Sequence, residues 1–323
     1  MEGKNIAVVF PGQGSQKAGM GRDFFDTVPV SRETFEEATQ ILGWDVADMC
    51  FSGDERLNLT EYAQPCIVTT EIAMLRGLQA LYGFDPSYFG GHSLGEYSAL
   101  VAAGAMPLAE ALRITQTRGQ LMQQASPVGE GAMAAVISDG LDLEKLAGVL
   151  SDLPMDIANV NSTRQVVISG QSSALTEVEE RLMKMAADAD ALRFVPLNVS
   201  APFHSRFMEN IKGSFKDALS TLTKKLNPVP ARRVTSNVSG LFHSESTNEI
   251  IDRLVAQLSG TVQWKKNMHA LAAHADVIYE VGPGRPLRDF FKTIGVTCSS
   301  ITNLRSAQRL FGPVGERKVV AAG

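Results

Sequence analysis

A serine between two glycines is the first candidate for chemistry in this chain. Residues 91–95 are Gly-His-Ser-Leu-Gly and match the pattern G-x-S-x-G, in which a sharp strand-to-helix turn exposes a serine. The glycines suit such a turn because a side chain at either position would collide across it. An apolar segment precedes the pattern and a segment of small residues follows it. We therefore interpret Ser93 as a nucleophile rather than an idle serine in a glycine-rich turn.

A serine needs a base in order to attack at neutral pH, and histidine is the usual one. The chain has five histidines: His92, His204, His243, His269 and His274. The first adjoins the serine in a tight turn, where neighbouring side chains point apart. His243 lies in a serine-rich loop and the last two lie in a polar helical segment, so these three are expected on the surface. His204 directly follows a predicted strand and leads by elimination, which leaves a catalytic and a structural role both open.

A second strand-end loop, residues 11–16, contains Gly12, Gln13 and Gly14. Such a loop can aim a backbone N–H at an oxyanion, which is the largest single contribution to acyl-transfer catalysis. Taken alone it could equally cradle a phosphate. It lacks, however, the third glycine of the dinucleotide fingerprint and the lysine of a P-loop.

The composition excludes several classes of protein. The 323 residues are 44% hydrophobic and 20% charged, as in a folded globular chain, and the net charge of −5 argues against nonspecific nucleic-acid binding. Cys50, Cys66 and Cys298 form no metal pair, and their odd number fits a reducing compartment. The longest uncharged stretch, between Glu96 and Glu110, is too short to cross a bilayer. We therefore expect a cytoplasmic protein with no metal, no membrane segment and no nucleic-acid partner.

Short apolar strands alternate with longer helices, which predicts an α/β fold. Buried strands are expected at 6–10, before 91, at 234–237 and at 277–281, and helices at 32–42, 64–81, 97–105 and 108–124. Between these, strands are expected at 132–137, 155–159, 165–170 and 193–199, with helices at 142–150 and 174–187. This β-α-β-β-α-β order is that of a ferredoxin-like unit, inserted because the earlier alternation resumes after it.

The expected organisation has three parts. Residues 1–128 and 200–308 form a discontinuous core, and residues 129–199 form the inserted subdomain. Residues 309–323 are expected to be a C-terminal tail or linker, because Gly, Pro, Lys, Ala and Val dominate after Leu310.

Seven segments together identify a family. In chain order they are Phe10-Pro-Gly-Gln-Gly-Ser-Gln16, Gly91-His-Ser-Leu-Gly-Glu-Tyr97, Thr117-Arg-Gly-Gln-Leu-Met122, Ala158-Asn-Val-Asn-Ser162, Pro202-Phe-His204, Val262-Gln-Trp264 and Glu280-Val-Gly-Pro-Gly284. All resemble segments of the malonyl-CoA:acyl carrier protein transacylases of bacterial fatty-acid synthesis, whose near relatives are polyketide-synthase acyltransferases. The order is the family's, and the resemblance covers about residues 5 to 305.

The resemblance implies an acyltransferase that moves malonyl from malonyl-CoA to the phosphopantetheine thiol of an acyl carrier protein. Ser93 would carry the malonyl ester in a ping-pong cycle, and His204 would be the general base and acid. The backbone N–H groups of Gln13 and Leu94 would form the oxyanion hole. No cofactor of the enzyme's own is implied, because the partner carries the phosphopantetheine.

Three further roles follow from the resemblance. Arg118 is similar to the arginine that pairs with the malonyl carboxylate, and Gln257 to the residue whose backbone carbonyl orients the histidine. Phe203 resembles the residue of malonyl-selective acyltransferases and favours a polyketide context, as does the expected linker. The fold implied is an α/β-hydrolase-like core, built on a parallel sheet, with an inserted ferredoxin-like subdomain.

Three other functions are less consistent with these residues than the transferase. An acyl hydrolase that clears carrier proteins would use the same serine, but it acts on neutral acyl chains and has no use for Arg118. An ordinary esterase is disfavoured because neither a downstream Asp-then-His order nor an HGGG-type loop is evident. A catalytically dead docking module would be expected to lack Ser93 or His204, and both are present.

Overall fold

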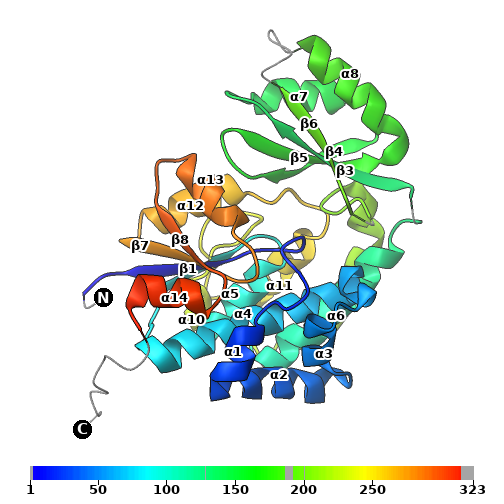
Figure 1. Ribbon diagram of the computed structural model, residues 1–323. Coiled ribbons are helices and arrows are strands. Elements are labelled where there is room, and N and C mark those ends of the chain that lie inside the picture. Colours follow the sequence, from blue (N-terminus) through cyan, green and yellow to red (C-terminus); the bar gives the residue numbers. More distant parts are fainter. Residues whose placement is uncertain (1–2, 128, 186–191, 200, 314–323) are drawn as a thin grey trace.

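Two sheets organise the chain (Figure 1). The computed structural model describes residues 3–127, 129–185, 192–199 and 201–313. The first sheet is parallel, with the order β2-β1-β7-β8 and the strands β1 Ile6–Phe10, β2 Tyr88–Gly91, β7 Val277–Val281 and β8 Cys298–Ile301. The second is antiparallel, with the order β4-β5-β3-β6 and the strands β3 Gly131–Ile137, β4 Met155–Val160, β5 Gln165–Gln171 and β6 Arg193–Leu197.

Helices cover both faces of the parallel sheet. Those of this part of the chain are α1 Arg22–Thr27, α2 Pro29–Leu42, α3 Val46–Phe51, α4 Thr60–Tyr82, α5 Gly95–Ala102, α6 Leu108–Gln124, α9 Lys212–Ser220, α10 Pro228–Ala231, α11 Thr247–Ala256, α12 Trp264–Ala272, α13 Pro286–Lys292 and α14 Leu304–Phe311. Short 3-10 turns lie at Glu55–Asn58, Ser172–Ala174 and Arg206–Ile211. None of the helices within the described ranges is long and apolar enough to cross a membrane.

The central strand β1 shows how the two faces are divided. All five of its residues are buried, and alternate side chains enter different clusters. Ala7 and Val9 pack with apolar residues of α12 and α13. Ile6, Val8 and Phe10 join the large cluster that contains α1, α2, α4, α5 and α6. A strand buried on both sides explains why its sequence is uninterrupted by polar residues.

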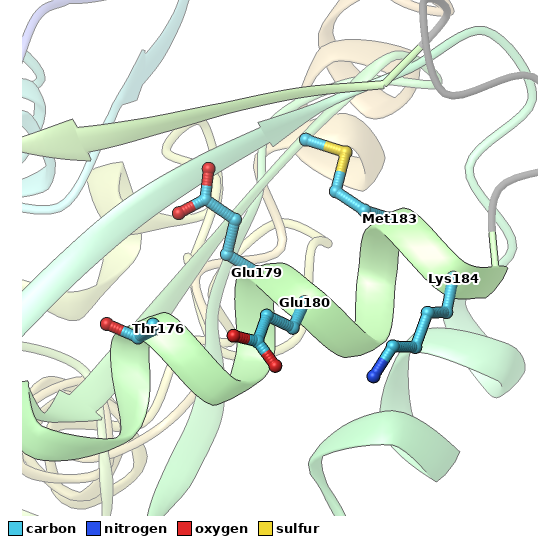
Figure 2. Close-up of a pocket in the computed structure, with 5 residues that line it drawn as sticks. All are labelled: Thr176, Glu179, Glu180, Met183 and Lys184. Carbon is cyan, nitrogen blue, oxygen red and sulfur yellow. The ribbon is translucent and has the colours of Figure 1, made fainter.

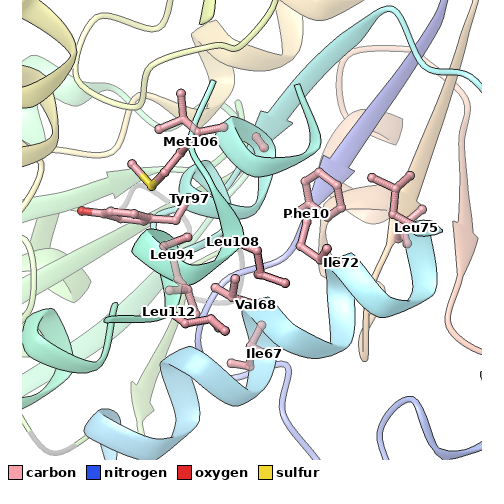
Figure 3. Packing of buried hydrophobic residues seen from close by; sticks show 14 of the residues in the cluster. Phe10, Ile67, Val68, Ile72, Leu75, Leu94, Tyr97, Met106, Leu108 and Leu112 are labelled. Carbon is pink, nitrogen blue, oxygen red and sulfur yellow. The ribbon is translucent and has the colours of Figure 1, made fainter. Parts of the chain in front are cut away.

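Helix α4 is the centre of the large cluster, with α5 and α6 packed beside it (Figure 3). Phe10, Ile72 and Leu108 are three of the side chains that meet there, each from a different element. Gly119 lets α6 approach α4 closely, because a Cβ at this position would lie 2.6 Å from the carbonyl oxygen of Thr60. This contact fixes the helix that carries Arg118.

The predicted fold is confirmed in both of its parts. The antiparallel sheet, with α7 Leu143–Leu150 and α8 Leu175–Met185, has the chain order β-α-β-β-α-β and its own apolar cluster. Several contacts join it to the rest of the chain, among them a bridge where the N–H of Val160 donates to Val262 O (2.9 Å) and the N–H of Val262 donates to Ala158 O (2.8 Å).

Two predictions about the elements of the fold are wrong. Residues 234–237 do not form a strand: Val234 and Thr235 make only isolated bridges. The pairing does not continue to Asn237, because its N–H donates to a buried carboxylate instead of a neighbouring strand. The tail expected from residue 309 begins later, because α14 extends to Phe311. Strand β8 was not predicted, since only two of its four residues are apolar. The domain boundaries at 128 and 200, the end of the helix expected to reach 187, and residues 314–323 of the expected tail lie outside the described residues.

Phe311 tests whether α14 belongs to the core. Its ring packs on those of Tyr82 (5.1 Å between centroids), Tyr279 (5.5 Å) and Phe84 (5.6 Å). Phe311→Ala should lower the free energy of unfolding by about 2–4 kcal/mol, because it empties a buried aromatic site. Leu310→Ala, at a neighbouring position that is 42% exposed, is the control and should cost under about 1 kcal/mol. Urea denaturation measures both, and equal small losses would place α14 outside the core.

Candidate active site

The serine at position 93 lies on a turn that only glycine-flanked sequence can make. It sits between β2 and α5, and its φ of 50° is in the left-handed region. A Cβ on Gly91 would lie 1.9 Å from the carbonyl carbon of Gly95, and a Cβ on Gly95 would lie 2.2 Å from Phe10 O. The predicted elbow is therefore confirmed as a structure, and it presents the serine at the carboxyl end of the parallel sheet.

The structure brings His204 to this serine. Ser93 Oγ and His204 Nε2 are 2.7 Å apart, and His204 Nδ1 is 2.7 Å from the backbone carbonyl oxygen of Gln257. A carbonyl only accepts, so Nδ1 carries the proton and the lone pair of Nε2 faces the serine hydroxyl. This tautomer lets the serine donate its proton to the ring. His204 also has a left-handed backbone, with φ of 58°.

Arg118 is the third side chain at the nucleophile. It is 1% exposed, and its Nη2 donates to Ser93 Oγ (3.2 Å) and to Gln257 Oε1 (3.0 Å). Its Nη1 donates to Gln64 Oε1 (3.0 Å), and its guanidinium lies 5.6 Å from the centroid of the Tyr97 ring. No carboxylate of the described residues forms an ion pair with it. A buried cation with neutral direct partners is suited to receive an anionic ligand.

The two backbone groups expected in the oxyanion hole lie in loops packed on each other. A Cβ on Gly12 would be 2.6 Å from the carbonyl oxygen of His92, so the loop that holds Gln13 lies directly against the elbow. Leu94 precedes α5 at its N-terminal end. Within the described part of the chain, neither the Gln13 nor the Leu94 backbone N–H has a hydrogen-bond acceptor.

The electrostatics of the site keep the histidine neutral. Burial and the nearby Arg118 cation lower the pKa of His204 to about 3, although its bond to the Gln257 carbonyl opposes the shift. Burial also lowers the pKa of the Arg118 guanidinium, which remains charged because an arginine does not deprotonate in proteins. The imidazole is therefore neutral at neutral pH, and the lone pair of its Nε2 faces the serine hydroxyl.

The other histidines lie apart from Ser93 Oγ. His92 Nε2 is 2.7 Å from Asn161 Oδ1, and its ring packs on Trp264. His269 and His274 are exposed, as predicted. The prediction for His243 is wrong: it is 3% exposed, and its Nε2 is 2.8 Å from Glu96 Oε1. The sequence of its loop is typical of an exposed segment, because the carboxylate that His243 contacts is 147 residues away in the chain.

Three side chains at the site were not predicted from the sequence. Gln64 is buried on α4 and holds Arg118, and its one sequence signal is a polar residue within an apolar helical segment. Asn237 accepts from the backbone N–H of Ser93 (2.6 Å) and donates to Gly91 O (2.7 Å). Glu96 lies buried behind the elbow. No local pattern identifies the last two, since their partners are distant in sequence.

Within the described residues, neither Phe203 nor the hollow on helix α8 forms a second reactive centre. Phe203 is 7% exposed and packs in the large apolar cluster beside His204 in sequence. A shallow hollow along α8 is lined by Thr176, Glu179, Glu180, Met183 and Lys184, all on one helix (Figure 2). The described residues contain no group of three or more His, Cys, Asp or Glu that could hold a metal ion.

A serine bonded to a neutral histidine, with a buried cation beside it on this α/β fold, fits an enzyme that passes an acyl group through a serine ester. Comparison with known proteins gives that class, since the acyl transferase domain family matches residues 7–288. The malonyl CoA-acyl carrier protein transacylase of Bacillus subtilis (strain 168) is 38% identical over 296 residues, which are 90% of each chain. The chain belongs to the malonyl CoA-acyl carrier protein transacylase family.

Two solved structures show the same fold. The acyl carrier protein S-malonyltransferase of Vibrio cholerae O1 biovar eltor has a TM-score of 0.86 and 34% identity, over 95% of this chain and 99% of that one. A malonyl-transacylase in complex with its type II PKS acyl-carrier protein has a TM-score of 0.84 and 32% identity, over 95% and 99% of the two chains. The α/β-hydrolase-like core with a second subdomain is thus the architecture of the family.

The depressed pKa of His204 predicts an acid-sensitive fold. Its folded value of about 3 lies below the ordinary 6.5, so between these values the unfolded chain binds a proton that the folded chain does not. Acidification below pH 6.5 therefore removes stability, by up to about 1.4 kcal/mol per pH unit. The difference in unfolding free energy between wild type and His204→Asn should shrink at that rate from pH 6 to pH 5.

Urea denaturation at several pH values measures this difference. His269→Asn, on the exposed face of α12, is the matched control and should follow the wild-type curve. Parallel curves for wild type and His204→Asn would show that burial does not shift this histidine.

Proposed function

We propose that the protein transfers malonyl from malonyl-CoA to the phosphopantetheine thiol of an acyl carrier protein, with Ser93 carrying the malonyl group between them. The observation that carries the proposal is the contact between the buried Arg118 guanidinium and the hydroxyl of a serine that also bonds His204. A donor that presents both a thioester and a carboxylate satisfies the nucleophile and the cation together. Malonyl-CoA is such a donor.

The first half of the cycle forms the acyl-enzyme. Ser93 Oγ attacks the thioester carbonyl as its proton moves to His204 Nε2, and the Gln13 and Leu94 N–H groups stabilise the oxyanion. Collapse of this tetrahedral intermediate breaks the carbon–sulfur bond, and the departing CoA sulfur takes the proton from His204. The Gln257 carbonyl holds the imidazole in the required tautomer and stabilises its charged form without adding a net negative charge beside an anionic substrate.

The second half returns the enzyme to its starting state. The phosphopantetheine thiol gives its proton to His204, and its sulfur attacks the ester carbonyl. The bond to Ser93 Oγ then breaks and the serine takes the proton back. A single serine that serves donor and acceptor in turn requires a ping-pong cycle. The thiol belongs to the partner, so the proposed cycle uses no cofactor of the enzyme's own.

Arg118 supplies the selectivity in this proposal. An unpaired malonyl carboxylate beside the serine would lose hydration without compensation, at a cost of several kcal/mol. The planar guanidinium can hold both carboxylate oxygens and so orient the thioester toward Ser93. Phe203, next to His204, is proposed as an apolar wall of the acyl site.

The proposed partner is an acyl carrier protein, and the proposed location is the cytoplasm. A malonyl-transacylase of the same fold is known in complex with an acyl-carrier protein, which supports that class of partner. Cys50, Cys66 and Cys298 are free and buried, which supports a reducing compartment.

Removal of the nucleophile tests the order of the chemistry. Ser93→Ala should abolish the mass increase of one malonyl group that malonyl-CoA produces on the wild-type protein, because no other group forms the ester. His204→Ala should slow the same labelling by about 10²–10⁴-fold, since it removes the general base. Intact-protein mass spectrometry measures both. Malonylation that persists on Ser93→Ala would remove Ser93 from the mechanism.

The role of Arg118 separates transfer of malonyl from hydrolysis of neutral acyl groups. Arg118→Ala should lower kcat/KM for malonyl-CoA by a factor of about 100 or more, which corresponds to about 3 kcal/mol for a bidentate charge pair. Activity toward acetyl-CoA should be kept or increased, because the uncompensated cation has gone. Steady-state kinetics with each donor provide the test, and equal losses with both would make Arg118 structural and favour an acyl hydrolase.

A further inference from the structure

The side chain of Gln257 connects the buried cation to the nucleophile elbow. Its Oε1 accepts from Arg118 Nη2 (3.0 Å), and its Nε2 donates to the carbonyl oxygen of Ser93 (3.1 Å). The same Nε2 donates to Glu96 Oε2 (2.7 Å). The amide is 1% exposed, so protein groups and not bulk water decide which way it points.

Glu96 is a buried carboxylate whose two oxygens are both occupied. Its Oε1 is 2.8 Å from His243 Nε2, and its Oε2 accepts from Gln257 Nε2 and from the backbone N–H of Asn237 (3.0 Å). The side chain of Asn237 in turn holds the backbone N–H of Ser93. The Glu96 carboxylate therefore anchors Gln257 and Asn237, which both contact the elbow. Within the described structure Glu96 itself has no hydrogen bond to Ser93 Oγ or to Arg118.

The chemistry of a carboxylate fixes the direction of the Gln257 amide. An ionised carboxylate only accepts hydrogen bonds, so it draws the NH2 end of the amide toward itself. The carbonyl end must then face Arg118, which has only donors. With the amide reversed, two acceptors would meet at Glu96 and two sets of donors would meet at Arg118. The unsatisfied buried groups would be costly.

We propose that Glu96 is a positioning residue for the selectivity of the transfer, acting through the Gln257 amide to hold the Arg118 guanidinium toward Ser93. This inference rests on the proposed function, because the position of the guanidinium matters only for a donor that has a carboxylate. Glu96 touches no reacting atom, and its loss should affect malonyl and acetyl donors unequally. A residue that merely stabilised the fold would affect both donors alike.

A competition experiment measures this difference directly. The protein is incubated briefly with equal concentrations of malonyl-CoA and acetyl-CoA, and the ratio of malonyl-enzyme to acetyl-enzyme is read by intact-protein mass spectrometry. The ratio does not depend on the fraction of protein that is folded. Glu96→Leu should lower it by about tenfold or more, since a hydrogen bond to a charged group is lost from the chain of contacts.

Two further variants define the result. Glu96→Gln can place its oxygen toward Gln257 and Asn237 while its NH2 donates to the other tautomer of His243, so it should keep the ratio within about threefold of wild type. Glu71→Leu is the matched control. Glu71 is also fully buried and bonds Ser98 of the same helix α5, but within the described structure it has no hydrogen bond to Gln257 or Arg118, so its removal should leave the ratio unchanged.

The outcomes separate this inference from the proposed function. A wild-type protein that forms no malonyl-enzyme would refute the function itself. A labelled wild type with the same ratio in Glu96→Leu would overturn the role of Glu96 alone. Where Glu96→Leu yields no active protein, Gln257→Leu carries the test, because it removes the amide and keeps the backbone carbonyl that orients His204. A Gln257→Leu ratio equal to that of wild type would overturn the inference as well.

Discussion

A guanidinium buried among neutral partners is the constraint on which the rest of the site depends. Arg118 is almost completely enclosed, and its direct contacts are two amide oxygens, a serine hydroxyl and an aromatic ring. Burying such a charge without an anion is expensive. The carboxylate that partly compensates this charge is that of Glu96. It is separated from Arg118 by the side-chain amide of Gln257, and it also contacts His243. The site therefore retains an unmet attraction for an anion beside Ser93, and in the proposed function this attraction favours an acyl group that has a carboxylate.

Backbone strain is concentrated at the two residues that we propose exchange the proton. Ser93 and His204 are the non-glycine residues of the described chain with positive φ, and each such residue costs about 1–3 kcal/mol. The surroundings hold both in place. Gly91 and Gly95 permit the elbow, and Asn237 bonds the backbone on both sides of it. A strained serine and a strained histidine can thus keep their 2.7 Å contact without substrate.

Local sequence predicted what local interactions determine. The apolar run at β1 and the β-α-β-β-α-β order of the subdomain follow from periodicity, and the elbow follows from steric limits on glycine. Local sequence does not predict contacts between residues that are far apart in the chain. Elimination among the histidines indicated His204. It did not indicate the backbone carbonyl of Gln257 as the group that orients the ring, which came from the family resemblance. The burial of His243 and the anchoring by Asn237 depend on Glu96, which is more than 140 residues away. Strand β8 is specified by its neighbour in the sheet rather than by its own two apolar residues.

In the proposed mechanism the enclosed guanidinium receives the carboxylate of the acyl group while Ser93 carries the ester. A crystal structure of the protein trapped after reaction with malonyl-CoA tests it most directly. We expect a malonyl ester on Ser93 Oγ, with both carboxylate oxygens about 2.7–2.9 Å from the nitrogen atoms of Arg118. An ester whose carboxylate points to solvent, while Arg118 keeps only its contacts with Gln64 and Gln257, would contradict it.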